Sequence, residues 1–140
     1  MTWQIREGAS CIKSAFFEAV AGFDAGPIHL QTSINLNGTE LVNEWRKLQA
    51  EATINFCLQW VDRYRELIEA ARHQTGEVSH YRRRRPADSR LDPERTLAEQ
   101  FELLRVVDND RYPAFFEWRG RCYELHVRLE QLQNHPVQLC

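Results

Sequence analysis

The stretch that decides the expected fold is residues 39–73, TELVNEWRKLQAEATINFCLQWVDRYRELIEAARH, which contains neither glycine nor proline. A continuous helix of this length would span about 50 Å, whereas a compact domain of this chain length has a radius of gyration of about 14 Å. The large apolar residues recur at steps of three and four, as on one face of an α-helix; they are Leu41, Trp45, Leu48, Ala52, Phe56, Trp60, Tyr64, Leu67 and Ala71. The sequence therefore predicts a long helix that either kinks or packs against another subunit.

The apolar side of this helix is wider than one neighbouring helix covers, because Val42, Cys57, Val61 and Ile68 broaden it. In so short a chain, we expect a second copy or a different protein to cover the surplus. The sequence thus predicts a homo-oligomer, such as a dimer, or a subunit of a protein complex. The expected interface residues are Trp45, Trp60, Val61 and Ile68.

The segment before the long helix has a mixed character. Residues 11–23, CIKSAFFEAVAGF, fit a short helix that Asp24 and the following Gly-Pro interrupt. In residues 28–36, IHLQTSINL, apolar and polar residues alternate, which predicts a strand. Only the segment around Trp3 offers a strand partner within the chain; otherwise the strand pairs with another subunit or lies as extended coil.

The segment after the long helix reads as a loop followed by two helices. Residues 77–91 lack apolar periodicity, and Asp92-Pro93-Glu94 is typical of a helix start. In the last helix, a heptad seam is formed by Phe115, Trp118, Cys122, Leu125, Leu129 and Leu132. We therefore expect a mostly α fold, a three- to four-helix bundle around the long helix with a short N-terminal extended or β segment. The expected single domain 1–140 consists of a mixed segment 1–38, the long helix 39–75, an Arg-rich loop 76–91 and two helices within 92–134.

Composition indicates a soluble, cytoplasmic protein. The chain has 140 residues, a net charge of −2 and 43% hydrophobic residues, and no window approaches the ~18 unbroken apolar residues of a membrane span. The N-terminal MTWQIREG lacks the basic and apolar profile of a signal peptide. The four cysteines are scattered, and we expect buried free thiols.

An arginine run is the most concentrated charge of the chain. Only Lys13 and Lys47 of the 18 basic residues are lysine, a bias that suits phosphate and carboxylate recognition but that a GC-rich genome also produces. The candidate partner- or phosphate-binding residues are Tyr81, Arg82, Arg83, Arg84, Arg85 and Arg90. The guanidinium groups could contact an RNA or DNA backbone with Tyr81 stacked on a base, or dock an acidic protein surface, or remain in a solvated loop.

The segment WRGRCYELHVRL contains Arg119 and Arg121 upstream of His126. These spacings resemble the R-x4-6-H signature of HEPN-type ribonucleases, which are small all-helical proteins. The resemblance implies metal-independent RNA cleavage at a dimer interface, with Arg119, Arg121 and His126 as candidate catalytic residues on one helix.

No other motif points to a chemistry. The sequence lacks a C-x-x-C pair and paired Glu-x-x-His motifs, so we expect neither a metal nor a cofactor. The favoured hypothesis is a non-enzymatic helical interaction or adaptor module that self-associates or docks in a larger assembly, with the Arg-rich loop for an acidic partner. The alternatives are the HEPN-like ribonuclease and a nucleic-acid-binding accessory subunit.

Overall fold

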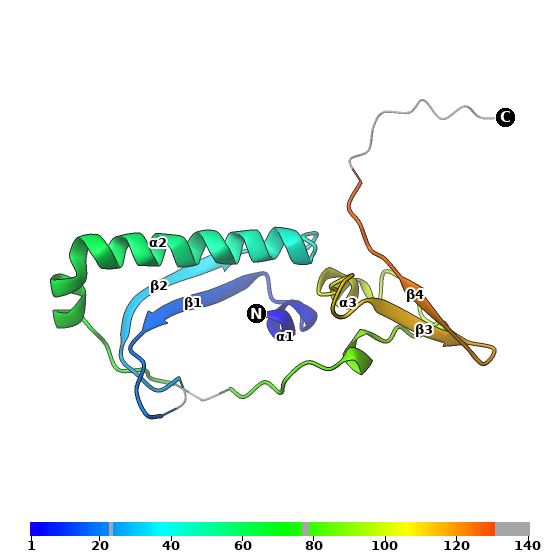
Figure 1. Ribbon diagram of the computed structural model, residues 1–140, viewed down its shortest axis with the longest axis horizontal. Helices are drawn as coiled ribbons and strands as arrows, with labels where there is room; N and C mark the ends of the chain where they lie inside the picture. The colour runs from blue at the N-terminus through cyan, green and yellow to red at the C-terminus, as the bar shows by residue number, and fades with distance from the viewer. Residues whose placement is uncertain (23, 77–78, 131–140) are drawn as a thin grey trace.

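The computed structural model describes residues 1–22, 24–76 and 79–130, and it contains two β-hairpins as well as helices. The expected three- to four-helix, all-α bundle is therefore wrong: the chain is a mixed α/β protein with two lobes placed end to end (Figure 1). In chain order, the elements are α1 (Thr2–Arg6), β1 (Cys11–Phe17), β2 (Ile28–Asn35), α2 (Val42–Glu69), the 3-10 helix η1 (Pro86–Ser89), α3 (Phe101–Arg105), β3 (Ala114–Trp118) and β4 (Arg121–Leu125).

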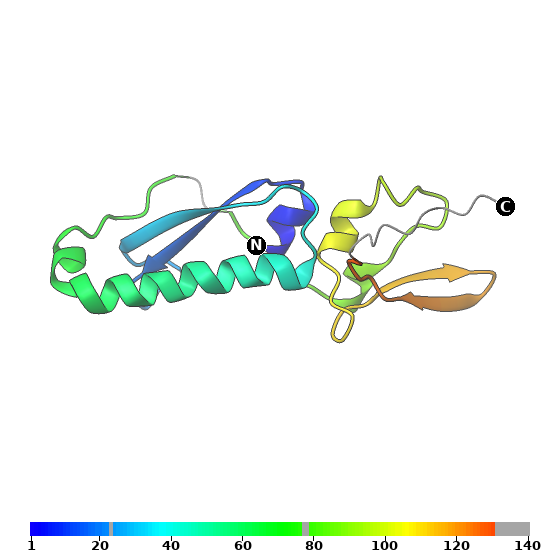
Figure 2. The ribbon, with the colours of Figure 1, turned by 90° about the horizontal axis from the view of Figure 1, so that it is seen from above.

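The N-terminal lobe is the antiparallel hairpin β1–β2 with α2 lying along it (Figure 2). The strand predicted in residues 28–36 is confirmed, but its partner is β1 and the Trp3 segment is the short helix α1. The helix expected over residues 11–23 is wrong. Ile12 pairs with Ile34 in the ladder, and both are buried, because the strand pairing gives them a core that an isolated short helix would lack.

The long helix exists within the predicted range and has one kink. Its first turn is held by Glu44, whose carboxylate accepts a hydrogen bond from the backbone N–H of Leu41 (2.9 Å). The helix stays continuous through residues 53–55, where Thr53 Oγ1 donates to the carbonyl of Gln49 (2.9 Å). The kink lies at Arg63, which has non-helical φ and ψ of −133° and 22°.

The C-terminal lobe replaces the two helices expected within 92–134. Within the described residues 92–130, only α3, five residues long, is an α-helix. The expected heptad seam from Phe115 to Leu125 is instead the antiparallel hairpin β3–β4, Leu129 follows it, and Leu132 lies outside the described residues. Its two-residue turn, Arg119-Gly120, has positive φ at both residues (49° and 75°), as in the type I′ turn that matches the twist of a hairpin. The stacked rings of Phe116 and Tyr123, 5.2 Å apart, pair across the strands.

Two small cores lie side by side and share the end of α3. The first consists of Ile5, Ile12, Ile34, Leu36, Val42, Trp45 and Val106, and the second of Leu91, Leu103, Leu104, Val107 and Ala114. Val106 and Val107, the two residues directly after α3, belong to different cores, so this segment connects the two lobes. The described cysteines Cys11, Cys57 and Cys122 are free but exposed, contrary to the expectation of burial.

Candidate functional site

The candidate site lies at the loop between β1 and β2. The backbone N–H of Glu18 donates to the carbonyl of Pro27 (3.0 Å), which closes the base of the loop. At Gly26, a Cβ atom would lie 1.8 Å from the carbonyl oxygen of Glu18, so only glycine allows this close approach. We name the segment 18–27 the β1–β2 loop; its residue 23 lies outside the described residues.

Asp24 in this loop adopts a left-handed backbone conformation, with a φ of 48°. Gln74 holds the loop in place, because its side-chain Nε2 donates to the carbonyls of Asp24 (2.7 Å) and Gly26 (2.8 Å). The segment carrying Gln74 is itself fixed, since Arg72 and Ile28 exchange two backbone hydrogen bonds of 2.7 and 3.0 Å. The backbone conformation of Asp24, which carries an exposed carboxylate, is thus fixed by contacts with the rest of the chain.

An aromatic cavity of about 620 Å³ lies beside the loop, between the ends of the hairpin and the kinked end of α2. The rings of Phe16, His29 and Trp60 form a cluster, in which the Trp60 centroid lies 5.2 Å from that of Phe16 and 4.9 Å from that of His29. Glu18, His29 and His73 are the titratable groups of its lining. We refer to this space as the aromatic cavity.

His29 has a defined tautomer in its neutral form. Its Nδ1 lies 3.1 Å from the carbonyl oxygen of Leu67, and a carbonyl oxygen only accepts hydrogen bonds. The proton must therefore reside on Nδ1, which leaves Nε2 as the nitrogen able to accept a proton. A smaller hollow of about 320 Å³ adjoins the aromatic cavity at Phe17 and contains Asp24. The two spaces place a carboxylate and an imidazole on one end of the molecule.

The arginine run is partly used within the chain. Arg82 binds the carboxylate of Asp88 through both terminal nitrogens and lies 4.6 Å from the ring centroid of Trp3. Arg84 donates to the Val106 carbonyl and to Ser89 Oγ (2.8 Å), and burial lowers its pKa. Tyr81 donates its hydroxyl proton to Glu7 (2.8 Å), and Arg90 pairs with Glu117 (3.3 Å).

Among the residues that the structure describes, the side chains of Arg83 and Arg85 form no ion pair. For these two, contact with an acidic partner or a phosphate backbone stays a prediction.

The three candidate catalytic residues of the C-terminal segment do not lie on a helix. Arg119 and Arg121 are at the tip of the β3–β4 hairpin, whereas His126 follows the other end of β4 and contacts Glu124 (Nε2 to Oε1, 2.9 Å). The shared helix that the HEPN resemblance requires is absent from the described segment 112–130, so this resemblance has no geometric support.

The expected interface residues separate into two groups. Trp45 is buried, and its indole Nε1 donates to the carbonyl of Arg105 (3.0 Å), while Trp60 belongs to the aromatic cavity. Val61 and Ile68 are 75% and 52% exposed, so they remain candidates for contact with a partner, although Ile68 also lines the aromatic cavity.

Among the described residues, neither a metal-binding cluster nor a membrane-spanning helix is present. Residues 1–22, 24–76 and 79–130 contain no group of three or more His, Cys, Asp or Glu side chains that could hold a metal ion. In the same residues, no helix combines the length and apolar character required to cross a bilayer.

The comparison with solved structures identifies a similar fold. No protein-family model and no curated protein matches the sequence. Methionyl-tRNA formyltransferase from Clostridium thermocellum superposes on 88% of this chain with a TM-score of 0.58 and 21% sequence identity. This chain covers 58% of the length of that protein. At this identity the likeness shows the fold, a formyltransferase-like α/β arrangement.

Sequence reasoning missed the β1–β2 loop as a site. In the sequence, Asp24, Gly26 and Pro27 predict only the end of a helix, although Gly and Pro near an Asp are also typical of a turn that fixes unusual backbone angles. The residues Gln74 and Trp60 could not be assigned to it, because they reach the loop only through the tertiary fold.

Proposed function

We propose that this chain forms part of a group-transfer enzyme of the formyltransferase type, in which the β1–β2 loop carries the acid–base residue. The fold shared with a methionyl-tRNA formyltransferase over 88% of the chain supports this proposal. Because the chain covers 58% of that protein, the proposal concerns the part of such an enzyme that these residues form.

The single observation that carries the proposal is the conformation of Asp24. Non-glycine residues with positive φ are uncommon, and backbone held in such regions clusters at functional sites. Here the closed loop base, the tight approach at Gly26 and the two hydrogen bonds from Gln74 hold the backbone of Asp24 in this conformation.

The chemistry of formyl transfer to an amine fits the groups present. The amine nitrogen attacks the formyl carbon, a C–N bond forms, the bond from carbon to the leaving group breaks, and the nitrogen must lose a proton. A carboxylate at Asp24 or the Nε2 of His29 is able to accept that proton. The aromatic cavity, with Trp60 and Phe16 in its wall, would receive the apolar part of the acceptor.

The test is a model reaction with the full chain. Methionine amide serves as acceptor and 4-nitrophenyl formate as activated donor, and mass spectrometry quantifies N-formylmethionine amide against a buffer blank. We expect a rate above the blank that falls about 100-fold in Asp24→Asn, because general base catalysis contributes about 10²–10⁴-fold. Asp110→Asn is the matched control, since Asp110 is an exposed carboxylate in the other lobe.

Two results would contradict the proposal. One is a wild-type rate that does not exceed the blank. The other is an Asp24→Asn variant, with an unchanged circular dichroism spectrum, that reacts as fast as wild type and as Asp110→Asn.

The interaction role expected from the sequence is a second candidate function, favoured by a different surface. Ile54, Leu58 and Val61 of α2 are each at least 60% exposed and contribute nothing to the lining of the aromatic cavity. Binding of a partner there and group transfer at the loop are therefore compatible.

A further inference from the structure

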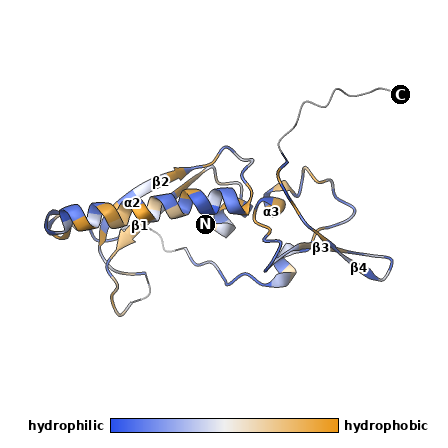
Figure 3. Cartoon of the chain, turned by 45° about the horizontal axis from the view of Figure 1, so that its top comes forward, coloured by the Kyte–Doolittle hydropathy of each residue, from blue (hydrophilic) through white to orange (hydrophobic). Residues whose placement is uncertain are grey.

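Helix α2 is apolar on two opposite sides. One side, which includes Trp45 and Phe56, is buried against the rest of the N-terminal lobe. The opposite side carries a row of exposed residues before the kink, which we name the outer stripe: Ala50, Ile54, Cys57, Leu58 and Val61. At 3.6 residues per turn, the side chains of these five residues fall within an arc of about 100° around the helix axis. The centre of this arc is about 150° from the buried side of the helix. Figure 3 shows hydrophobic residues along this helix among hydrophilic ones.

The large apolar residues of the outer stripe are mostly exposed to solvent. Ile54, Leu58 and Val61 are 60%, 61% and 75% exposed. A helix that is apolar on two sides is normally covered on both. Scattered exposed leucines need no explanation, but a continuous row on one helix face marks a contact surface.

The charges that border the outer stripe indicate what covers it. Lys47 lies at its N-terminal end and Asp62 at its C-terminal end, on the same flank of the helix. Both side chains are exposed, and neither forms an ion pair within the part of the chain that the structure describes. The stripe therefore carries opposite charges at its two ends.

An antiparallel copy of the same helix would cover the outer stripe and would also pair the opposite charges at its two ends. With a two-fold axis near residue 55, Ala50 of one copy lies level with Val61 of the other, and Ile54 lies level with Cys57. Lys47 then comes within two residues, about 3 Å of helix rise, of Asp62 in the second copy. A parallel pair would instead place Lys47 level with the second Lys47 and Asp62 level with the second Asp62, so no opposite charges would meet.

We propose that a second copy of this chain docks antiparallel on the outer stripe, giving a two-fold symmetric dimer in which Lys47 of each copy pairs with Asp62 of the other. The contact between residues 47 and 62 is about 23 Å long and one helix wide, which is at the small end of protein interfaces. The dimer is accordingly weak, with a Kd on the order of micromolar.

The experiment is sedimentation equilibrium of the full chain over a range of concentrations. Leu58→Asp raises the Kd at least about tenfold, because a charge replaces an apolar contact at the centre of the stripe. Leu97→Asp is the matched control, since Leu97 is 64% exposed, close to Leu58 at 61%, but lies in the other lobe. Circular dichroism verifies that both variants fold.

Charge exchange tests the antiparallel arrangement itself. Lys47→Asp or Asp62→Lys alone raises the Kd about threefold to tenfold, because each creates two like-charge contacts. The double variant restores the wild-type Kd to within about twofold, as the pairs are re-formed with reversed signs. A short bis-maleimide cross-linker joins two copies through Cys57, so Cys57→Ser loses the product and Cys11→Ser retains it.

Three results would overturn the proposal. The first is a wild-type chain that remains monomeric up to several hundred micromolar. The second is a dimer whose Kd Leu58→Asp and Leu97→Asp change equally. The third is a double charge variant that is no tighter than either single variant.

Discussion

At the scale of single residues, Asp88 organises the basic segment. Its carboxylate accepts hydrogen bonds from Arg82 Nη1 (2.8 Å) and from the backbone N–H of Arg85 (2.7 Å), and Arg6 lies 3.9 Å away. Arg82 also accepts, through its carbonyl, a hydrogen bond from the indole of Trp3 (2.7 Å). One carboxylate therefore joins η1 to α1 and holds part of the arginine run against its own chain.

Asp88 gives a prediction about the pH dependence of stability. The hydrogen bond from Arg82 lowers the pKa of Asp88 to about 2, although burial opposes this, whereas an unfolded Asp has a pKa of about 3.9. A lowered pKa means that the ionised group stabilises the fold above about pH 4, and that this contribution is lost as the pH falls through 2. We expect Asp88→Asn to lower the unfolding free energy by about 2 kcal/mol at pH 7.

Urea titrations from pH 7 down to pH 2 measure this effect. The difference between wild type and Asp88→Asn should shrink as the pH falls from 4 to 2, whereas a constant difference would show that the carboxylate charge is unimportant. Asp92→Asn is a control at an exposed acidic residue.

At the scale of elements, the β3–β4 hairpin depends on its turn. Arg119 and Gly120 both have positive φ, and a Cβ atom added at Gly120 would meet nothing within 4 Å. The cost of a side chain at residue 120 is therefore conformational alone, without a steric clash.

The turn predicts opposite effects for two substitutions. Gly120→Ala should destabilise the protein by about 1 kcal/mol, because an L-residue is disfavoured at this φ. Arg119→Asn should be neutral or stabilising by a few tenths of a kcal/mol, since Asn tolerates the left-handed region that the type I′ turn requires. Thermal unfolding measures both, and equal midpoints for Gly120→Ala and wild type would contradict this account of the turn.

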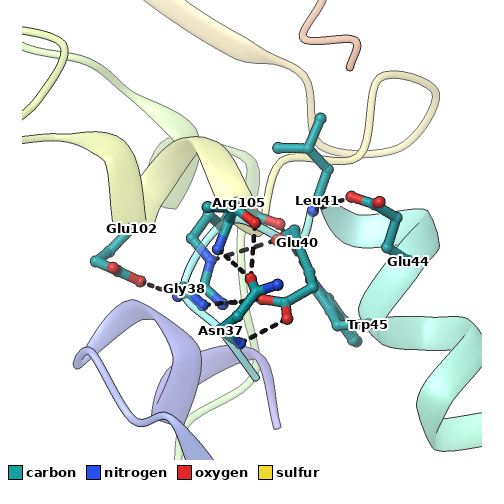
Figure 4. A network of polar contacts seen from close by, with 9 residues as sticks. Asn37, Gly38, Glu40, Leu41, Glu44, Trp45, Glu102 and Arg105 are labelled. Atoms are coloured by element: carbon teal, nitrogen blue, oxygen red, sulfur yellow. Dashed lines mark hydrogen bonds and ion pairs between the residues drawn. The ribbon is translucent and has the colours of Figure 1, made fainter. Parts of the chain in front are cut away.

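At the scale of the whole molecule, Arg105 joins the two lobes. Its side chain is 2% exposed and donates to Glu102 (2.7 Å), to Glu40 Oε2 (3.1 Å) and to the Glu40 carbonyl (3.3 Å) (Figure 4). Burial alone would raise the pKa of Glu40, but the backbone N–H groups of Asn37 and Gly38, with the charge of Arg105, lower it overall. A second bridge pairs Arg46 with Asp108 (2.8 Å).

We therefore expect Arg105→Met to lower the free energy of unfolding by weakening the contact between the lobes. It leaves the mostly buried Glu40 without its cation, which costs about 3–5 kcal/mol. Replacing Glu40 by Gln together with Arg105→Met should recover part of this loss, because no charge is then left unpaired. Urea unfolding with intrinsic tryptophan fluorescence measures each variant, and a double variant less stable than Arg105→Met would refute the explanation.

Local periodicity predicted some elements and misassigned others. The helix at 42–69 and the strand at 28–35 were predictable, because each maintains its own period over many residues. In CIKSAFF and AFFEWRGRCYEL the aromatic residues suit a helix seam and a strand equally, and pairing with distant residues decides in favour of strands. The Arg-Gly turn was also missed, since arginine is uncommon at positive φ.

The sequence by itself determined the long amphipathic helix, the strand before it and the excess of apolar surface on that helix, since each depends on spacing along the chain. Only the tertiary structure decided that the chain is an α/β protein, that Asp88 holds part of the arginine run, and that Gln74 holds the backbone of Asp24 in the loop. Gln74 lies 50 positions from Asp24 and Arg6 lies 82 positions from Asp88, and no local pattern specifies which distant segments the burial of apolar surface brings together.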